Sequence, residues 1–456
     1  MVRVLTLSGE SNSCIIPATD SDIISVNLAG DTIVVLNSLT AVTDLLENNR
    51  SAIYSERPPF PMLNDLVGAH WNIGFMRYGP KWKEHRRVFM KQFQPSEVLL
   101  HRPKELEAAR VLLRLLLDSP HKYERHMRHM SGMIMLSTAY GIDILPENDP
   151  YVEISEKALQ AIVAATYRGS YLVDSLPILK YVPEFFPGAG FKKQAREWFS
   201  VVDAMPDVPY DFVKKARVSF RIHDQLPTTL TENLNSITAG RWHGSVVDRT
   251  VSALETLILA MTIYPEVQRK AQAAIDEVVG RDRLPDFGDN IPYIDAVVHE
   301  ILRWRPVIPL AIPHAVMEDD IYKGYHIPAG SVVVGNAWAI LHDETTYGPD
   351  TDQFIPERWL TVDGKINEEM PDSSPAFGFG RRICPGRDMA QWSVWISAAS
   401  ILSVFNITKS LDKKGMPIEP SGEYTSGMLC YPLPHECDII PRSSAAEEMI
   451  RRAQLA

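Results

Sequence analysis

The sequence predicts a mainly α-helical protein with small β-sheets, an α+β fold. From about residue 95 to residue 280, apolar residues recur at spacings of three and four, which is the period of an amphipathic helix. Residues 23–36 alternate between apolar and polar side chains, and short strand-like runs broken by Pro and Gly follow Arg305. No linker-like stretch separates these regions, so we expect a single domain over residues 1–456.

The first elements are a hairpin and a short helix. The runs IISVNL and DTIVVLNS flank Ala29-Gly30, and two alternating runs around such a pair predict a β-hairpin. Ser38 then begins a helix that ends near Asn48. Residues 1–22 carry no such pattern and are expected to be irregular.

Two consecutive helices follow in the second half of the helical region. The run TVSALETLILA is apolar almost throughout, which predicts a buried helix. Pro265 ends that helix, since proline breaks a helix interior, and the amphipathic run after it stops at Gly280, a residue type favoured just past a helix end. Before them, prolines and polar residues interrupt the pattern, so we expect residues 201–248 to be loop-rich and regard 201–250 as atypical.

The last part of the chain predicts a small β region and a tail. The run DDIYKGYHI is a hairpin candidate with its turn at Lys323-Gly324. Short apolar runs on either side of it, VIPLAIP and SVVVGN, are strand candidates. Residues 441–456 are expected to form a C-terminal tail.

The composition excludes several classes of protein. The net charge is −11, whereas a protein that binds nucleic acid usually has a basic surface, so we expect no nucleic-acid partner. Four cysteines without a C-x-x-C pair argue against a disulfide framework and favour a reducing compartment. No apolar run approaches the roughly 18 residues that a membrane-spanning helix needs, so we expect no transmembrane helix.

The most informative segment is PAFGFGRRICPGRDMA. It holds Phe377, Gly380, Arg382, Cys384 and Gly386 in the spacing FxxGxRxCxG, which describes a cysteine in a tight loop immediately before a helix. The helix N-terminus favours the thiolate form of Cys384, and a thiolate can ligate haem iron. Arg382 could pair with a haem propionate, because guanidinium groups bind carboxylates well. A buried structural cysteine is the alternative, but five fixed positions within ten residues count against it.

This segment resembles the haem-binding loop of the cytochrome P450 family, and the resemblance extends over roughly residues 23–440. It is particularly close to fungal members of secondary metabolism. The resemblance implies the cytochrome P450 fold, with haem b between the long central helix and the helix after Cys384. Cys384 would be the iron ligand, and Phe377, Arg382 and Gly386 would contact the cofactor.

Two further segments resemble haem-contacting parts of the family. In YGPKWKEHRR, Trp82 and Arg86 lie four residues apart, so they share one helix face. They resemble the WxxxR pair that contacts haem propionates, and a solvated basic helix is the alternative. His314, in IPHAV, matches a histidine that meets a propionate in many members, although a histidine in a strand is more often simply a hydrogen-bonded polar residue.

Three charged residues resemble a structural network of the family. Glu300 and Arg303, in HEILRWRP, lie three residues apart on one helix and can pair. Arg358 lies in FIPERW, which resembles the family pattern FxPERF. By resemblance, the three form a buried charge network behind the haem loop. Buried charges are tolerated only when they are paired, so the loss of one member should be severe.

The proton-relay motif of the family is altered in this chain. The long central helix of the family carries A-G-x-D/E-T-T, whose acid and hydroxyl deliver protons for O–O cleavage. Here ITAGRWHGSVVDRTVSALE ends the motif with Asp248, Arg249 and Thr250, so Arg249 replaces the key hydroxyl. In the other register Trp242 and His243 take the two places. Asp248 and Thr250 are the catalytic candidates, and the alternative is that they stabilise the start of a helix.

The resemblance implies a haem-thiolate monooxygenase that oxidises an apolar small molecule with O2, in fungal terpenoid or polyketide biosynthesis. Electrons would come from a separate NADPH-cytochrome P450 reductase, since no GxGxxG segment with a suitable acid is present. The alternatives are an O2-independent haem-thiolate isomerase or dehydratase, and an inactive haem-binding remnant. The altered relay motif favours both alternatives.

The resemblance also suggests where partners bind. The substrate pocket would be lined by Trp71, Asn72, Phe75, residues 307–312, Gly427, Met428 and Leu429. The reductase would dock near Cys384 on Lys83, Arg87, Arg381 and Arg387. Eukaryotic members usually begin with a membrane helix that this sequence lacks, which suggests a soluble form or a shortened start. We expect a monomer on the cytoplasmic side, with peripheral membrane contact and with endoplasmic reticulum association from family resemblance only.

Overall fold

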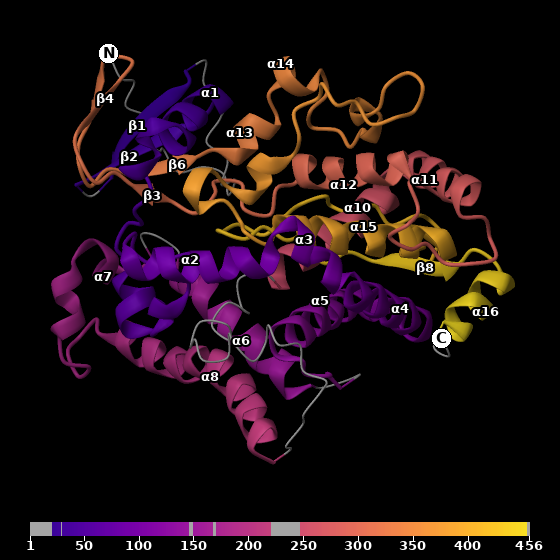
Figure 1. Cartoon of the computed structure of the whole chain (residues 1–456), viewed down its shortest axis with the longest axis horizontal. Helices are drawn as coiled ribbons and strands as arrows, with labels where there is room; N and C mark the ends of the chain where they lie inside the picture. Colours follow the sequence, from indigo (N-terminus) through magenta and orange to yellow (C-terminus); the bar gives the residue numbers. More distant parts are fainter. Residues whose placement is uncertain (1–20, 29, 146–148, 167–169, 220–246, 454–456) are drawn as a thin grey trace.

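The computed structural model describes residues 21–28, 30–145, 149–166, 170–219 and 247–453. The N-terminal segment that was expected to be irregular lies almost entirely outside these ranges. Most strands gather at one end of the molecule, β8 lies toward the other end, and helices form the rest, which confirms the predicted mainly α-helical fold with small sheets (Figure 1). No helix within the described ranges combines the length and the apolar character needed to cross a bilayer.

The largest sheet joins the N-terminal hairpin to strands from much later in the chain. β1 (Ile23–Leu28) pairs antiparallel with β2 (Asp31–Leu36), as predicted. β2 pairs parallel with β6 (Val332–Gly335), whose other edge holds β3 (His314–Ala315). This order holds His314 in a sheet with the N-terminal hairpin, although 278 residues separate it from the end of β2 in the sequence.

The second predicted hairpin is also present. β4 (Asp320–Tyr322) pairs antiparallel with β5 (Tyr325–Ile327). The two turn residues, Lys323 and Gly324, have φ angles of 49° and 82°. A two-residue turn with positive φ at both positions matches the twist of the flanking strands, which explains why the turn forms here.

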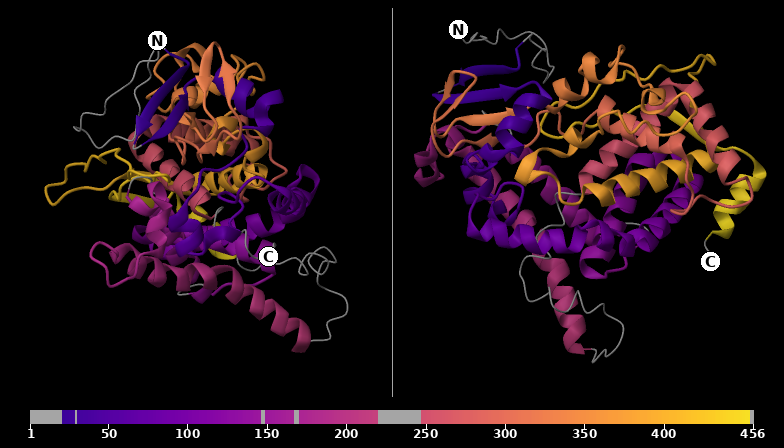
Figure 2. Two further views of the ribbon diagram at one scale, coloured as in Figure 1. Left: turned by 90° about the vertical axis from the view of Figure 1, so that its left-hand side faces the viewer. Right: turned by 45° about the horizontal axis from the view of Figure 1, so that its top comes forward.

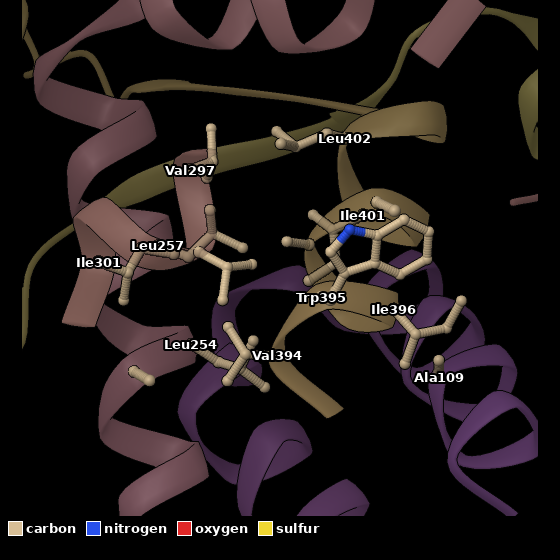
Figure 3. Packing of buried hydrophobic residues seen from close by; sticks show 14 of the residues in the cluster. Ala109, Leu254, Leu257, Val297, Ile301, Val394, Trp395, Ile396, Ile401 and Leu402 are labelled. Carbon is tan, nitrogen blue, oxygen red and sulfur yellow. The ribbon is translucent and has the colours of Figure 1, made fainter. Parts of the chain in front are cut away.

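Four helices enclose the main core. α4 (Arg102–Asp118), α10 (Val247–Ile263), α12 (Pro292–Trp304) and α15 (Arg387–Val404) bring together the apolar side chains drawn in Figure 3. α10 is the buried helix that its continuous apolar run predicts, and its residues from 251 to 261 are buried. Each large aliphatic side chain buried in this way contributes roughly 1.5–3 kcal/mol.

The remaining helices surround this core. In chain order they are α1 (Leu39–Val42), α2 (Pro80–Phe93), α3 (Pro95–Val98), α5 (Tyr123–Tyr140), α6 (Pro150–Ala165), α7 (Leu172–Ser175), α8 (Gly190–Ser219), α11 (Pro265–Val278), α13 (Ala337–Leu341), α14 (Glu344–Tyr347) and α16 (Ser444–Arg452). As predicted, α10 ends just before Pro265, which begins α11, and Gly280 with φ 80° follows the end of α11.

The expectation of a loop-rich segment was wrong for residues 201–219, which belong to α8. Pro206 and Pro209 lie inside this helix, although a proline in a helix interior costs about 3 kcal/mol or more. Packing offsets this cost, because Val202 and Met205 are fully buried where α8 lies along α6. Figure 2 shows that the C-terminal end of α8 extends beyond the other helices. The rest of the segment lies outside the described residues.

The expectation of a C-terminal tail was also wrong for most of its length. The last strand, β8 (Cys437–Pro441), pairs antiparallel with β7 (Phe405–Lys409), and α16 follows. Ser443 caps α16 by accepting a hydrogen bond from the N–H of Ala446 at 3.1 Å, and Ile450 is fully buried. Apolar residues at spacings of three and four are the sequence signal for this helix.

Glu105 is a buried acid where α4 meets α15. Its side chain is fully buried, and Oε1 accepts a hydrogen bond from Ser393 Oγ at 2.6 Å. Oε2 is buried without a hydrogen-bond partner among the described residues. Burial raises the pKa of Glu105 to about 7, against the opposing effects of the Ser393 hydrogen bond and the charge of Arg102. The folded state therefore favours the protonated acid.

Because the pKa of Glu105 rises from 4.5 to about 7 on folding, the free energy of unfolding should fall as the pH rises through this window. At about 1.4 kcal/mol for each pH unit, the ionised group destabilises the fold at pH 8 by on the order of 3 kcal/mol. We expect Glu105→Gln to stabilise the protein more at pH 8 than at pH 5 in urea unfolding. Glu107→Gln, at an exposed position of the same helix, is the control. An equal effect of E105Q at both pH values would contradict the prediction.

Candidate active site

Cys384 lies in a tight loop in front of α15. Its backbone N–H donates a hydrogen bond to the carbonyl oxygen of Phe377 at 2.9 Å, which closes the loop. Gly380 has φ 57°, and a Cβ at this position would lie 1.9 Å from the carbonyl oxygen of Leu46. Only glycine fits there, so the first glycine of the motif is required by a close backbone contact. Gly386 is the N-cap of α15.

Cys384 lines a cavity in the described part of the chain, together with residues of α2, α10 and the segment before β3. Of the cysteines that the structure describes, no other lines it. Cys437 lies in β8, where burial raises the pKa of its thiol to about 12 and keeps it protonated. No Asp or Glu is among the described residues of the wall, which are Arg57, Ile73, Gly74, Trp82, Arg86, Phe89, Arg249, Ile308, Ala311, Ile312, His314, Ala376, Phe377, Gly378, Phe379, Arg382, Cys384 and Pro385.

α2 brings Trp82 and Arg86 to the same wall, one helical turn apart. The indole Nε1 of Trp82 is buried without a hydrogen-bond partner among the described residues. No hydrogen bond joins Arg86 to those residues either. Burial lowers the pKa of Arg86, and the negative charge of Cys384 opposes this effect. Two donors without partners at a cavity wall fit an anionic ligand.

Arg57 is a wall residue that sequence analysis missed. Its guanidinium donates hydrogen bonds to the carbonyl oxygens of Gly74, Ile312 and Pro313 at 2.8, 2.7 and 2.8 Å. Burial lowers the pKa of Arg57 well below its usual value, and neighbouring arginines lower it further. Its donors meet neutral oxygens, and the nearby charge of Glu56 favours its charged form.

His314 and Arg382 complete the polar wall. Nδ1 of His314 lies 2.7 Å from the carbonyl oxygen of Tyr54, and because a carbonyl only accepts, Nδ1 carries the proton. Burial lowers the pKa of His314 well below its usual value, so the ring is neutral and Nε2 is unprotonated. Arg382 donates to the carbonyl oxygens of Ser55 and Met76 at 2.8 and 2.9 Å, and burial lowers its pKa to about 9.

These residues fit a haem group. The open donors of Trp82 and Arg86, with the buried charge of Arg382, suit carboxylates such as haem propionates. Gly378 lines the cavity, and a Cβ on it would meet no atom within 4 Å, so the wall is open there. The sulfur of Cys384 is a ligand that haem iron accepts. Gly386 is not among the cavity residues, so its role is that of a helix cap.

Glu300 is the centre of a buried charge network behind this loop. Nε and Nη2 of Arg303 donate to its two carboxylate oxygens at 2.8 and 2.9 Å, and both side chains are 0% exposed. Nε of Arg358 donates to the same carboxylate at 3.1 Å. Trp359 Nε1 and the backbone N–H of Ile355 add hydrogen bonds of 2.9 and 2.8 Å. Sequence analysis did not single out the last two donors.

At the start of α10, the cavity is lined by Arg249 and not by Thr250. Thr250 is buried at 5% exposure, and it is not among the described wall residues. Successive helix residues point about 100° apart, which explains why one of the two faces the cavity and the other does not. Asp248 lies in the first turn of α10, but its side chain lies outside the described residues, as do Trp242 and His243.

Of the segments expected to line a substrate pocket, one reaches the cavity and the others do not. Segment 307–312 reaches the cavity through three of its residues. Trp71 and Phe75 pack in a separate apolar cluster with Phe60, and Leu429 packs against the 307–312 segment. None of Trp71, Asn72, Phe75, Gly427, Met428 or Leu429 is among the described cavity residues.

A thiol in a closed loop before a helix and a cavity wall that carries four arginines fit a haem-thiolate protein. The sequence model of the cytochrome P450 family matches residues 18–436. This chain therefore belongs to the cytochrome P450 family.

Several similar proteins come from fungi. A cytochrome P450 monooxygenase of Armillaria gallica is 44% identical over 447 residues, which cover 94% of this chain and 87% of that protein. A cytochrome P450 of Hericium erinaceus is 44% identical over 450 residues, covering 95% and 84%. A tryptamine 4-monooxygenase of Psilocybe cyanescens is 40% identical over 439 residues, covering 93% and 86%. The family and these relatives support a haem-dependent monooxygenase of fungal secondary metabolism.

Glu300→Gln should destabilise the fold strongly, because it leaves Arg303 and Arg358 buried without a countercharge. Breaking a buried ion pair on one side costs about 3–5 kcal/mol. We expect a corresponding fall in the free energy of urea unfolding. Glu153→Gln removes the partner of Lys157 in an exposed pair and should leave the stability nearly unchanged. Equal stability of wild type and E300Q would refute the structural role of the network.

Proposed function

We propose that Cys384 is the iron ligand of this monooxygenase and that the substrate is a small terpenoid or polyketide intermediate. The observation that carries the proposal is the position of Cys384 in a cavity wall that contains four arginines and no described acid. When bound, haem supplies the oxidation of a C–H bond by O2. The thiolate of Cys384 would increase the electron density on iron, which favours O–O cleavage.

The wall residues would bind and orient the cofactor. Trp82 Nε1 and the Arg86 guanidinium would donate to one propionate, because both lack partners within the described chain. Arg382 would face the other propionate. A carboxylate beside His314 would favour protonation of its Nε2, which could then donate as well. Phe377 supplies apolar surface and helps to exclude water.

Proton delivery is proposed to run along the first turn of α10, through the Asp248 carboxylate and the Thr250 hydroxyl. Thr250 is buried and does not line the cavity, whereas its sequence neighbour Arg249 does. This arrangement favours a water that bridges the Thr250 hydroxyl and the cavity over direct contact.

The electron donor is proposed to be a separate NADPH-cytochrome P450 reductase. Lys83 and Arg87 on α2, and Arg381 and Arg387 beside Cys384, are all exposed. These four residues lie in the two segments that form the wall around the thiol, and the chain as a whole has a net charge of −11. An acidic partner surface would be steered to such a local positive area, mainly through a faster association rate.

Cys384→Ala should remove the thiolate-type Soret band from the reduced carbon-monoxide difference spectrum of the haem-loaded protein, because no other described cysteine lines the cavity. The matched control is Cys437→Ala, which changes a half-buried cysteine in β8 and should keep the band. With reductase, NADPH and substrate, wild type should consume O2, and C384A should not.

Two results would count against this proposal. A thiolate-type band that survives in C384A would move the ligand to another cysteine. Turnover of an organic peroxide without NADPH-dependent O2 uptake would indicate the isomerase or dehydratase reaction instead.

We also propose peripheral contact with the cytoplasmic face of the endoplasmic reticulum membrane. The segment from the start of α7 to the start of α8, whose ribbon is seen in Figure 1, exposes six large apolar side chains, which we call the apolar patch: Leu172, Leu176, Ile178, Tyr181, Phe185 and Phe186. Phe185 is 89% exposed and Ile178 is 73% exposed. Exposed apolar side chains that gather in this way are characteristic of interaction surfaces, and aromatic residues favour the membrane interface.

The protein should sediment with phosphatidylcholine vesicles, and the double substitution of Ile178 and Phe185 by Ser should reduce the bound fraction several-fold. The control is Val362→Ser, which removes an equally exposed apolar side chain outside the apolar patch. Failure of wild type to bind vesicles, or equal binding by the double variant, would argue against membrane contact.

A further inference from the structure

Arg57 and Arg249 are the two described cavity arginines to which no propionate is assigned, and of these Arg57 is already held by three backbone carbonyl oxygens. Arg249 is the only described wall residue that α10 contributes. Its Nε is buried and has no hydrogen-bond partner, and no ion pair joins Arg249 to a described residue. The side chain as a whole is only partly buried, but a buried donor without a partner is unfavourable, so an anion that accepts a hydrogen bond from Nε would stabilise this arrangement.

The positive charge of the wall exceeds what the cofactor can balance. The wall carries four arginines and no described acid. Ferric iron is neutralised by the porphyrin and one thiolate, so haem brings only its two propionates to the wall. Glu56 lies outside the wall, and its negative charge raises the pKa values of Arg57 and Arg382. It also forms an ion pair with Arg77 at 2.9 Å, so its charge is shared. At least one positive charge remains without a partner.

The other three arginines have other interactions to compensate them. Arg57 and Arg382 donate to backbone carbonyl oxygens and feel the negative charge of Glu56. Arg86 lies one helical turn from the unpartnered Trp82, with which it is proposed to hold a propionate. Arg249, in contrast, lowers the pKa of Arg57, because the two positive charges repel each other. The uncompensated charge is therefore assigned to Arg249.

We propose that Arg249 binds a carboxylate of the substrate, so that the enzyme acts on small monocarboxylic acids with an apolar body. This inference rests on the haem-thiolate function proposed above and narrows its substrate class. A single guanidinium matches a monoanion, and its planar group binds a carboxylate through two parallel hydrogen bonds. Ile308, Ala311 and Ile312 provide apolar surface in the same cavity for the rest of the molecule.

The test compares acids with amides of the same shape on the full-length, haem-loaded chain. The probes are 4-phenylbutanoate with 4-phenylbutanamide and dodecanoate with dodecanamide, titrated by calorimetry at pH 7.5. We expect wild type to bind each acid roughly tenfold or more tightly than its amide, since a charge-assisted hydrogen bond is lost in the amide. Arg249→Leu should abolish this difference, and Arg249→Lys should keep part of it. Arg269→Leu removes an exposed charge from α11 and should keep all of it.

Three results would overturn the inference: equal affinities for acid and amide in wild type, no binding of either acid, or a full acid preference in R249L. Haem content is measured for each variant, because loss of haem in R249L with the acid preference intact would assign Arg249 to a propionate instead. A wild type that lacks the thiolate-type carbon-monoxide band would refute the proposed haem ligand. An acid preference that depends on Arg249 would stand even then, because calorimetry does not require that band.

Discussion

The cysteine loop is positioned by the buried carboxylate of Glu300, which binds groups from separate segments of the chain. Arg358 and Trp359 donate to it from the segment that precedes the loop, at 3.1 and 2.9 Å. The adjacent His299 stacks on Trp359 at 4.9 Å and reaches Ser373 Oγ at 3.1 Å, where the loop begins. One turn of α12 thus holds both segments, because a carboxylate without access to water needs all of these donors.

Backbone carbonyl oxygens hold two arginines of the cavity wall in place. Arg57 and Arg382 are held by carbonyl oxygens from three different segments, so their charges occupy fixed positions. Fixed charges need little reorganisation when an anion arrives, which favours tight binding. The same charges repel one another, and burial lowers their pKa values. Binding of an anionic cofactor should therefore also stabilise the fold.

Those parts of the site that depend on short sequence spacings could be predicted. The Cys384 loop, the pair of Trp82 and Arg86, and the pair of Glu300 and Arg303 each lie within one loop or one helix face. Arg57 could not be predicted, because its acceptors lie 17, 255 and 256 residues away in the sequence. The helix through residues 201–219 was missed for a related reason, since packing on α6 outweighs the cost of two prolines.

The start of α10 shows why helix register decides chemistry as well as packing. In the sequence, Arg249 occupies the position of a hydroxyl residue that relays protons in the family. In the structure, Arg249 lines the cavity. A guanidinium has donors only and keeps its proton at any ordinary pH, so it cannot accept and pass on a proton as a hydroxyl does. It can bind an anion well, however. If Arg249 binds the substrate as proposed, the chain would gain a means of ligand recognition at this position and lose a direct relay, and proton transfer would fall to Thr250, Asp248 and bridging water.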